Sequence, residues 1–257
     1  MYLPQVLQRY KEKDLSPHHA ALVELHNILQ SWASSCFVEI IASGSRAKGT
    51  AIARASDVDY LISLSSGCNE NNGGLEAIYN GLHSELVRFY PRLVRPQNVS
   101  FRVSLNGLEV DVTPARKHPG YTDYHSLYIS KEQTWKQTNV KKHNADISQS
   151  GRTNEIKILK IWRELNRLEF PSIYLEYLIV NNVLLNKPKD LNSLGDNVWH
   201  ILTELAKTQN NPLFAAIIDP ANSANILSNL LTISEKNKIM TQAQVAIRQQ
   251  NWNQIIV

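Results

Sequence analysis

Hydrophobic positions change their spacing along this chain, and the change divides the sequence into two parts. Ser16-Pro17 is a typical helix start, because proline favours the first helical turn. The apolar residues after it repeat at the spacing of one helix face: Leu25, Ile28, Leu29 and Trp32. The pattern predicts a helix that ends near Ser34.

Short apolar runs rich in β-branched residues then predict four strands. They cover residues 36–42, 57–64, 99–105 and 108–112. Helical spacing over about 75–89 separates the second strand from the third. Asn106-Gly107 lies between the last two and predicts a tight hairpin.

Beyond about Thr122 no strand is predicted, and helical spacing dominates. The expected helices cover residues 154–168, 171–185, 194–207 and 234–250. The fold class is therefore an α/β part followed by an all-α part. We expect two domains, residues 1–120 and 121–257, with the boundary inside the polar segment from His118 to Gly151.

Composition excludes several classes of protein. With 257 residues, 43% of them hydrophobic, the chain can bury a substantial core. It contains no apolar run of the roughly 18–20 residues that a membrane span needs, and its first residues lack the apolar segment of a signal peptide. We therefore expect a soluble, cytoplasmic protein. A net charge of +4 fits a phosphate-rich ligand, although many ordinary proteins share it.

The cysteines and histidines exclude a Cys-rich metal module. Cys36 and Cys68 are the two cysteines, and the eight histidines are scattered without zinc-ligand spacing. One disulfide between the cysteines stays open as an alternative. A zinc-ribbon DNA sensor is not expected.

Three aspartates carry the candidate chemistry. Asp57 and Asp59 are two residues apart in a predicted strand, so they project from the same face, and Asp111 interrupts the apolar pattern of a neighbouring strand. Carboxylates gathered on one face repel one another unless a cation compensates them. Oxygen ligands of this kind suit Mg²⁺. Two such ions about 3.5–4 Å apart can activate a hydroxyl and stabilise a leaving pyrophosphate.

The turn before the aspartates is a candidate phosphate-binding element. Gly44-Ser45 follows a predicted strand and opens a short helix, where backbone N–H groups can bind phosphate and the missing β-carbon permits close approach. It is not a P-loop, because the lysine required after Gly49 is replaced by Thr50. Alone, an Asp-x-Asp or a Gly-Ser is most often a solvated turn; their ordered combination favours a functional site.

This ordered set resembles the DNA polymerase β-like nucleotidyltransferase superfamily over residues 36–113. The resemblance implies a mixed sheet with flanking helices, two Mg²⁺ ions (Mn²⁺ as an alternative) and a nucleoside triphosphate, ATP or GTP, as donor. Asp57 and Asp59 would bind both metals and the triphosphate, and Asp111 would help to activate the attacking hydroxyl. Gly44 and Ser45 would hold the triphosphate.

The helical half is similar to the OAS/cGAS-like branch, which includes the bacterial cGAS/DncV-like enzymes. The similar segments are residues 157–162, 171–176 and 218–225. The resemblance implies that Lys160 contacts donor phosphates and that Ser172 adds a hydroxyl, in a helical domain that closes the nucleotide cleft. Lys157 could contact the phosphates in place of Lys160, and Lys160 could equally be a lysine exposed to solvent. Ser172 could be a helix cap. We interpret the Asp219-Pro220 segment as structural.

The resemblance departs from the family at the base-stacking position. In the family, an aromatic residue that stacks on the donor base often follows the equivalent of Ser172, but this chain has Ile173 there. Tyr174, Tyr177 or Tyr124 could stack on the base instead, and each of them could equally be a core residue. The expected function is synthesis of a cyclic or linear oligonucleotide messenger in antiphage signalling. The alternatives are nucleotide addition to RNA 3′ ends, as in CCA-adding enzymes, and antitoxin-type nucleotidylation of a protein.

Overall fold

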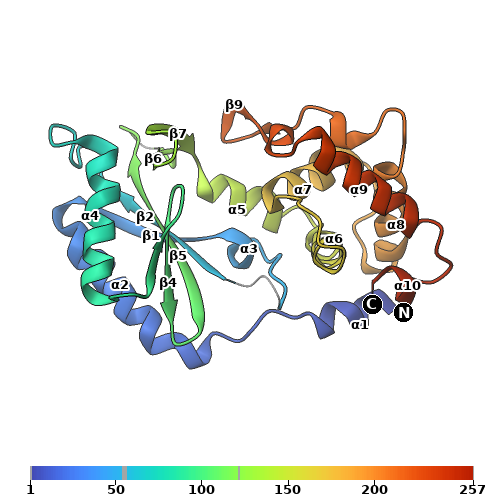
Figure 1. The fold of residues 1–257 in the computed structure, drawn as a ribbon, viewed down its shortest axis with the longest axis horizontal. Helices are drawn as coiled ribbons and strands as arrows, with labels where there is room; N and C mark the ends of the chain where they lie inside the picture. The colour runs from blue at the N-terminus through green and yellow to red at the C-terminus, as the bar shows by residue number, and fades with distance from the viewer. Residues whose placement is uncertain (1, 54–56, 121, 257) are drawn as a thin grey trace. The chain divides into compact units, whose positions relative to one another are not determined.

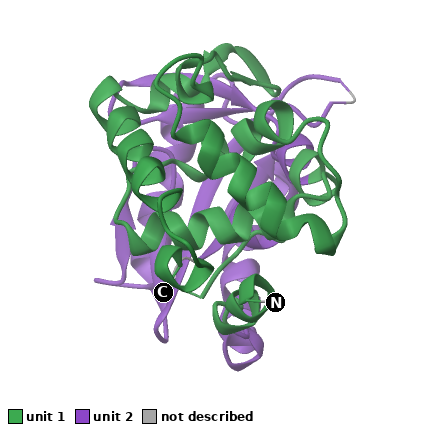
Figure 2. Ribbon diagram, turned by 90° about the vertical axis from the view of Figure 1, so that its right-hand side faces the viewer, with its two compact units in different colours: residues 1–13, 48–56, 145–257 green, residues 14–47, 57–144 purple. Residues whose placement is uncertain are grey.

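The computed structural model describes residues 2–53, 57–120 and 122–256 (Figure 1). By its internal contacts the chain divides into two discontinuous units, which differ from the continuous domains expected from the sequence (Figure 2). The sheet unit comprises residues 14–47 and 57–144, and the helical unit comprises residues 1–13, 48–56 and 145–257.

The sheet unit is built on a mixed sheet. Its central strands follow the order β1 (Phe37–Ser43), β2 (Val58–Leu64), β5 (Leu108–Lys117), β4 (Phe101–Leu105) and β3 (Val94–Pro96). β2 and β5 run parallel, and the other pairs run antiparallel. The far end of β5 also pairs with β6 (His125–Ile129), which pairs with β7 (Thr134–Thr138).

Helices α2 (His19–Ala33) and α4 (Gly74–Phe89) cover one face of this sheet (Figure 1). Their apolar stripes pack on the even-numbered residues of β2 and β5, such as Ile62 and Val110, which are fully buried. Because strand side chains alternate, the odd-numbered residues, Asp59 and Asp111 among them, belong to the opposite face. The core thus leaves both aspartates on the face that these two helices do not cover.

The four strands expected from the sequence are confirmed, as is the hairpin between β4 and β5. Asn106 and Gly107 both have positive φ, 51° and 83°, as this type of turn requires. The start of α2 differs in detail: a 3₁₀ turn over Ser16–His18 precedes it, and the Ser16 hydroxyl donates to Asp14 instead of capping the helix.

The expectation that strands end near Thr122 is wrong. β6 and β7 follow, and a short hairpin of β8 (Ile218–Asp219) and β9 (Asn222–Ile226) lies in the helical unit. β7 lacks alternation of buried and exposed positions, because its first three residues are all exposed, so only pairing with β6 identifies it as a strand. Two-residue β8 is too short for any periodic signal.

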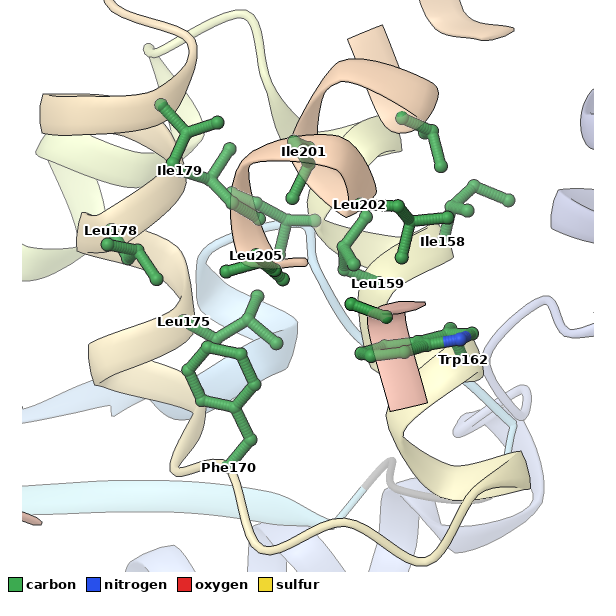
Figure 3. Packing of buried hydrophobic residues seen from close by; sticks show 14 of the residues in the cluster. Ile158, Leu159, Trp162, Phe170, Leu175, Leu178, Ile179, Ile201, Leu202 and Leu205 are labelled. Atoms are coloured by element: carbon green, nitrogen blue, oxygen red, sulfur yellow. The ribbon is translucent and has the colours of Figure 1, made fainter. Parts of the chain in front are cut away.

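The helical unit buries a second core. It contains α1 (Tyr2–Arg9), α6 (Thr153–Leu165), α7 (Ser172–Leu178), α8 (Leu194–Leu205), α9 (Ile233–Ala246) and α10 (Trp252–Ile255). Trp162 of α6 lies among leucines and isoleucines of α7 and α8 (Figure 3). Ile52 also belongs to this core, which explains why residues 48–56 group with the helices.

Two further helices lie along the chain at boundaries between the units. α3 (Gly44–Ala47) is the short helix expected after β1, and α5 (Val140–Ser148) follows β7. A disulfide joins Cys36 and Cys68, whose Cα atoms are 5.5 Å apart, so the alternative left open by the sequence is realised. None of the helices in the described part of the chain has the length and apolar character needed to cross a membrane.

Candidate active site

Backbone register brings two of the three aspartates together in the sheet unit. Asp59 of β2 and Asp111 of β5 are directly paired residues of the parallel strands. On the other side of β5, Arg102 of β4 is the antiparallel partner of Asp111. Since adjacent strands lie about 4.8 Å apart, these three side chains form one row across the sheet. Asp57 immediately precedes β2, two residues before Asp59.

The Gly44 turn lies against this row. Ser43, the last residue of β1, pairs with Asp59, so the chain turns into α3 beside that aspartate. Gly44 has a φ of 67°, and a β-carbon there would overlap the Asp59 carboxylate. Both the backbone conformation and the packing therefore require glycine. Ser45 follows in the first turn of α3, and Ser56 of the aspartate motif lies outside the described residues.

Arg102 joins Asp111 to Asp57. Its Nε donates to Asp111 Oδ1 at 2.8 Å, and its Nη2 donates to Asp111 Oδ2 at 2.8 Å and to Asp57 Oδ2 at 3.0 Å. The hydrogen bond to Asp111 is the main reason why the pKa of Arg102 is raised above its ordinary value, and the nearby carboxylates add to this. In the structure, the Arg102 guanidinium supplies the positive charge that a metal ion was expected to supply.

Two further side chains complete the surroundings of Asp111. Gln97 donates from Nε2 to Asp111 Oδ1 at 3.1 Å and is itself held by the Ser100 hydroxyl. Glu109, two residues before Asp111 on β5, has Oε2 3.9 Å from Arg102 Nε and 3.6 Å from Arg95 Nη2. That oxygen is buried without a hydrogen-bond partner.

The carboxylates fit a hard divalent cation by their chemistry. Oxygen donors on adjacent strands, with Asp57 still 45% exposed, suit Mg²⁺ and leave room for phosphate oxygens. Within residues 2–53, 57–120 and 122–256, however, no three acidic, histidine or cysteine side chains already surround one point in a metal-binding arrangement. Arg102 holds two of the three carboxylates instead.

In the helical unit, Lys160 belongs to a buried charge network. Its Nζ donates to Glu176 Oε1 at 2.7 Å and to the Thr50 hydroxyl at 2.8 Å, and the side chain is 2% exposed. Lys48 donates to the other carboxylate oxygen, Glu176 Oε2, at 2.9 Å. One buried carboxylate therefore neutralises only one of two lysines.

Burial and charge act against each other in this network. Burial would raise the pKa of Glu176, but the two lysines outweigh it, and the pKa lies below its usual value. Burial lowers the pKa of Lys160, and Glu176 opposes that shift. We conclude that Glu176 is ionised at neutral pH and that Lys160 is no solvated lysine.

Ser172 is the first residue of α7, where its hydroxyl accepts a hydrogen bond from Arg163 Nη1 at 3.0 Å. The N-cap residue of α7 is Pro171, so Ser172 is not the helix cap. Lys157, the substitute for Lys160, lies 3.7 Å from Glu12 and is more exposed. The roles of Lys160 and Ser172 in binding nucleotide stay predictions.

Two of the three candidate stacking aromatics are core residues. Tyr174 and Tyr177 are buried, and their hydroxyls donate to Leu213 O and to Asp146. Tyr124 is half-buried, with its ring near His118. The structural interpretation of Asp219 is confirmed, because its carboxylate accepts from Ala221 N and Asn225 Nδ2 within the β8–β9 hairpin.

Sequence reasoning missed four residues that hold the predicted ones in place: Arg102, Gln97, Lys48 and Glu176. Arg102 carried a usable signal, since a charged residue in a predicted strand next to the strand of Asp111 suggests a cross-strand ion pair. No signal in the sequence pointed to Glu176, because its lysine partners are 16 and 128 residues away.

Comparison with known proteins gives one curated relative. No family model matches the chain. The chain is 26% identical over 238 residues to a cyclic AMP-AMP-AMP synthase of Escherichia coli (strain MS 115-1), which covers 80% of this chain and 74% of that protein.

Solved structures share the fold over nearly the whole chain. E. coli MS115-1 CdnC in complex with HORMA-deltaN matches with a TM-score of 0.73 and 22% identity, covering 99% of this chain and 93% of that one. CdnC with ATP matches with a TM-score of 0.72 at 22% identity, over 99% and 94% of the two chains. The Cid1 poly(U) polymerase bound to MgATP matches with a TM-score of 0.67 and 14% identity, over 99% and 97% of the two chains.

These likenesses concern the fold as a whole. The fold expected from the sequence, a mixed sheet with flanking helices followed by a helical part, is confirmed. The chain therefore has the polymerase β-like nucleotidyltransferase fold, and the resemblance to the cGAS/DncV-like branch that its sequence indicated is confirmed.

Proposed function

We propose that this protein transfers nucleotidyl groups from nucleoside triphosphates to a hydroxyl and makes a cyclic or linear oligonucleotide messenger. The relative that covers 80% of the chain is a cyclic AMP-AMP-AMP synthase, and CdnC shares the fold over almost the full length. Both support an enzyme of the nucleotidyltransferase class. Antiphage signalling remains the expected setting.

One observation carries this proposal: Asp59 and Asp111 pair across parallel strands directly beside the Gly44 turn. Because Gly44 has no side chain, the backbone of the turn packs directly against the Asp59 carboxylate. The two carboxylates and the turn thus surround one position. Phosphoryl transfer needs a position where the groups that stabilise developing charge are already fixed.

Asp57, Asp59 and Asp111 would hold two divalent ions. When bound, such ions lower the pKa of the attacking hydroxyl and stabilise the charge on the leaving pyrophosphate. Asp57 and Asp59, from one strand, would contact both ions and orient the donor phosphates. Asp111, on the neighbouring strand, would orient the acceptor hydroxyl and accept its proton as the hydroxyl oxygen attacks the α-phosphate and pyrophosphate leaves.

Gly44, Ser45, Lys160 and Ser172 would bind the donor triphosphate. The Ser45 hydroxyl and nearby backbone groups would donate to phosphate oxygens. In the helical unit, two lysines share one buried carboxylate, and an oxygen of a bound phosphate would give their N–H groups a second acceptor. Glu176 would fix the lysines, and Arg163 would orient the Ser172 hydroxyl.

A second candidate function is nucleotide addition to an RNA 3′ end. The observation in its favour is the similarity to the Cid1 poly(U) polymerase, with a TM-score of 0.67 over 99% of the chain. That similarity concerns the fold, and the curated relative is a messenger synthase. We therefore favour the messenger.

The decisive experiment incubates the purified protein with each α-labelled nucleoside triphosphate and Mg²⁺ or Mn²⁺, with and without tRNA. We expect a small phosphatase-resistant product without RNA. Label found only on RNA would instead support terminal addition, and label on protein would support nucleotidylation of a protein.

The control is a pair of variants. D57A/D59A should abolish the product while the protein still melts cooperatively. D196A removes an exposed aspartate of α8 and should keep wild-type turnover. Full activity in D57A/D59A would refute the assigned site.

A further inference from the structure

Arg102 uses the oxygens that a divalent cation would need. It binds both oxygens of Asp111 and one oxygen of Asp57 with three hydrogen bonds of 2.8–3.0 Å. These are charge-assisted bonds, and the bond to both oxygens of Asp111 is bidentate, which makes it strong and geometrically specific. Arg102 therefore occupies the same carboxylate oxygens that a divalent cation would bind.

Glu109 offers Arg102 a second position. Side chains of Glu109 and Asp111 lie on the same face of β5, and Arg102 stands opposite Asp111 with Glu109 as its diagonal neighbour. Glu109 Oε2 is buried, lacks a hydrogen-bond partner and is 3.9 Å from Arg102 Nε. A buried acceptor without a donor is unfavourable, so a small shift of the guanidinium would satisfy it.

We propose that a divalent cation and the Arg102 guanidinium compete for the same oxygens of Asp57 and Asp111, and that Glu109 receives Arg102 when the cation binds. Arg102 thus sets the affinity for metal by holding the carboxylates together in a charge-compensated arrangement. When the cation binds Asp57 and Asp111, the Arg102 guanidinium moves to Glu109. Each positive group then keeps a carboxylate partner. This inference rests on the proposed metal-dependent function.

The test measures Mn²⁺ binding to the full chain without nucleotide, by the electron paramagnetic resonance signal of unbound Mn²⁺. R102Q should bind Mn²⁺ at least ~10-fold more tightly than wild type, equal to about 1.4 kcal/mol. R102K keeps the charge but cannot bind both oxygens of Asp111 in the same way, and it should also bind more tightly than wild type.

Arg95 provides the matched control. It contributes the same charge from β3, reaches Glu109 at 3.6 Å and is 74% exposed. R95Q should leave Mn²⁺ affinity unchanged. If R95Q tightens binding as much as R102Q, general charge removal explains the effect and the inference is wrong. If R102Q and R102K both match wild type, it is also wrong.

The role of Glu109 is tested by a double-mutant cycle. E109Q removes the charge that receives Arg102, so it should weaken Mn²⁺ binding in wild type and have no effect in R102Q. An equal effect in both backgrounds would show that Glu109 acts by its charge alone and would overturn the exchange. Absence of Mn²⁺ binding by wild type and all variants would refute the proposed function itself, which separates the two failures.

The melting temperature in EDTA supplies a second readout. R102Q leaves two neighbouring carboxylates without their guanidinium, so it should melt below wild type in EDTA and regain stability on addition of Mn²⁺. An unchanged melting temperature in EDTA would show that the ion pairs contribute nothing and would count against the inference. If R102Q does not melt cooperatively, R102K serves as the test variant for both measurements.

Discussion

The carboxylate of Asp59 occupies the space that a side chain at Gly44 would need. The turn and the acidic strand therefore constrain each other, since the aspartate can keep its position only if residue 44 has no β-carbon. A positive φ of 67° adds an independent requirement for glycine.

We predict that G44A abolishes nucleotidyl transfer and lowers the free energy of unfolding by more than about 1 kcal/mol. Gly107 provides the control: its φ is 83°, but nothing lies within 4 Å of its β-carbon position. G107A should lose less stability than G44A, because only its backbone conformation is strained, and it should keep its activity. Urea unfolding and the product assay measure both effects, and an active G44A would contradict the close packing.

We predict that E176Q lowers the free energy of unfolding by about 3–5 kcal/mol, because it leaves two buried lysines without their carboxylate. On α4, the exposed pair Arg88–Glu85 offers a contrast, and E85Q should change stability by less than about 0.5 kcal/mol. Urea unfolding of both variants distinguishes a buried network from surface charge. Equal effects would argue against the network.

The same carboxylate predicts a dependence on pH. Its pKa in the folded protein lies below the ordinary 4.5, so its stabilising effect is present above that value and is lost as the pH falls through the lower, folded pKa. In E176Q this part of the acid sensitivity should disappear. Unfolding free energies measured from pH 6 downward check the loss.

His125 predicts a second pH effect in the sheet unit. Its Nδ1 donates to the Asp123 carbonyl, its Nε2 contacts the Ser63 hydroxyl at 2.7 Å, and burial lowers its pKa from 6.5. Since the unfolded chain takes up the proton first, stability should fall as the pH drops below 6.5, by up to about 1.4 kcal/mol per pH unit until the folded pKa is reached.

H125Q should flatten this pH dependence, although the variant itself is less stable. H19Q changes an exposed histidine at the start of α2 and should keep the wild-type profile. Melting temperatures between pH 5 and 8 measure the slopes. A wild-type slope in H125Q would assign the acid sensitivity to other groups.

We predict that reducing the Cys36–Cys68 disulfide lowers the free energy of unfolding by about 3–4 kcal/mol, the loop-closure value for residues 32 apart. Urea unfolding with and without dithiothreitol measures the difference. C36S/C68S should be less stable and insensitive to dithiothreitol. Identical curves for the wild type under both conditions would show that the bond does not stabilise the folded state.

Several features could be predicted because they are encoded locally. The strand, the Gly44 turn and the Asp-x-Asp strand each follow from a few neighbouring residues, and strand alternation alone put Asp57 and Asp59 on one face. Asn106-Gly107 likewise specifies its hairpin by its own backbone preferences. Helical spacing located α6, α8 and α9 to within a few residues.

Other features depend on tertiary pairing, which no local pattern records. β7 is a strand because β6 supplies its hydrogen bonds. Glu176 meets Lys48 and Lys160 because a long-range fold brings three distant segments into one core.

The sequence by itself determined which acidic residues share a face and that their charges need a positive partner. Only the tertiary structure decided which strand stands next to Asp111, and thus that Arg102 supplies that charge to Asp57 and Asp111. The physical reason is range: alternation and turn preference act between neighbouring residues, whereas register between strands is set by burial of a whole sheet face.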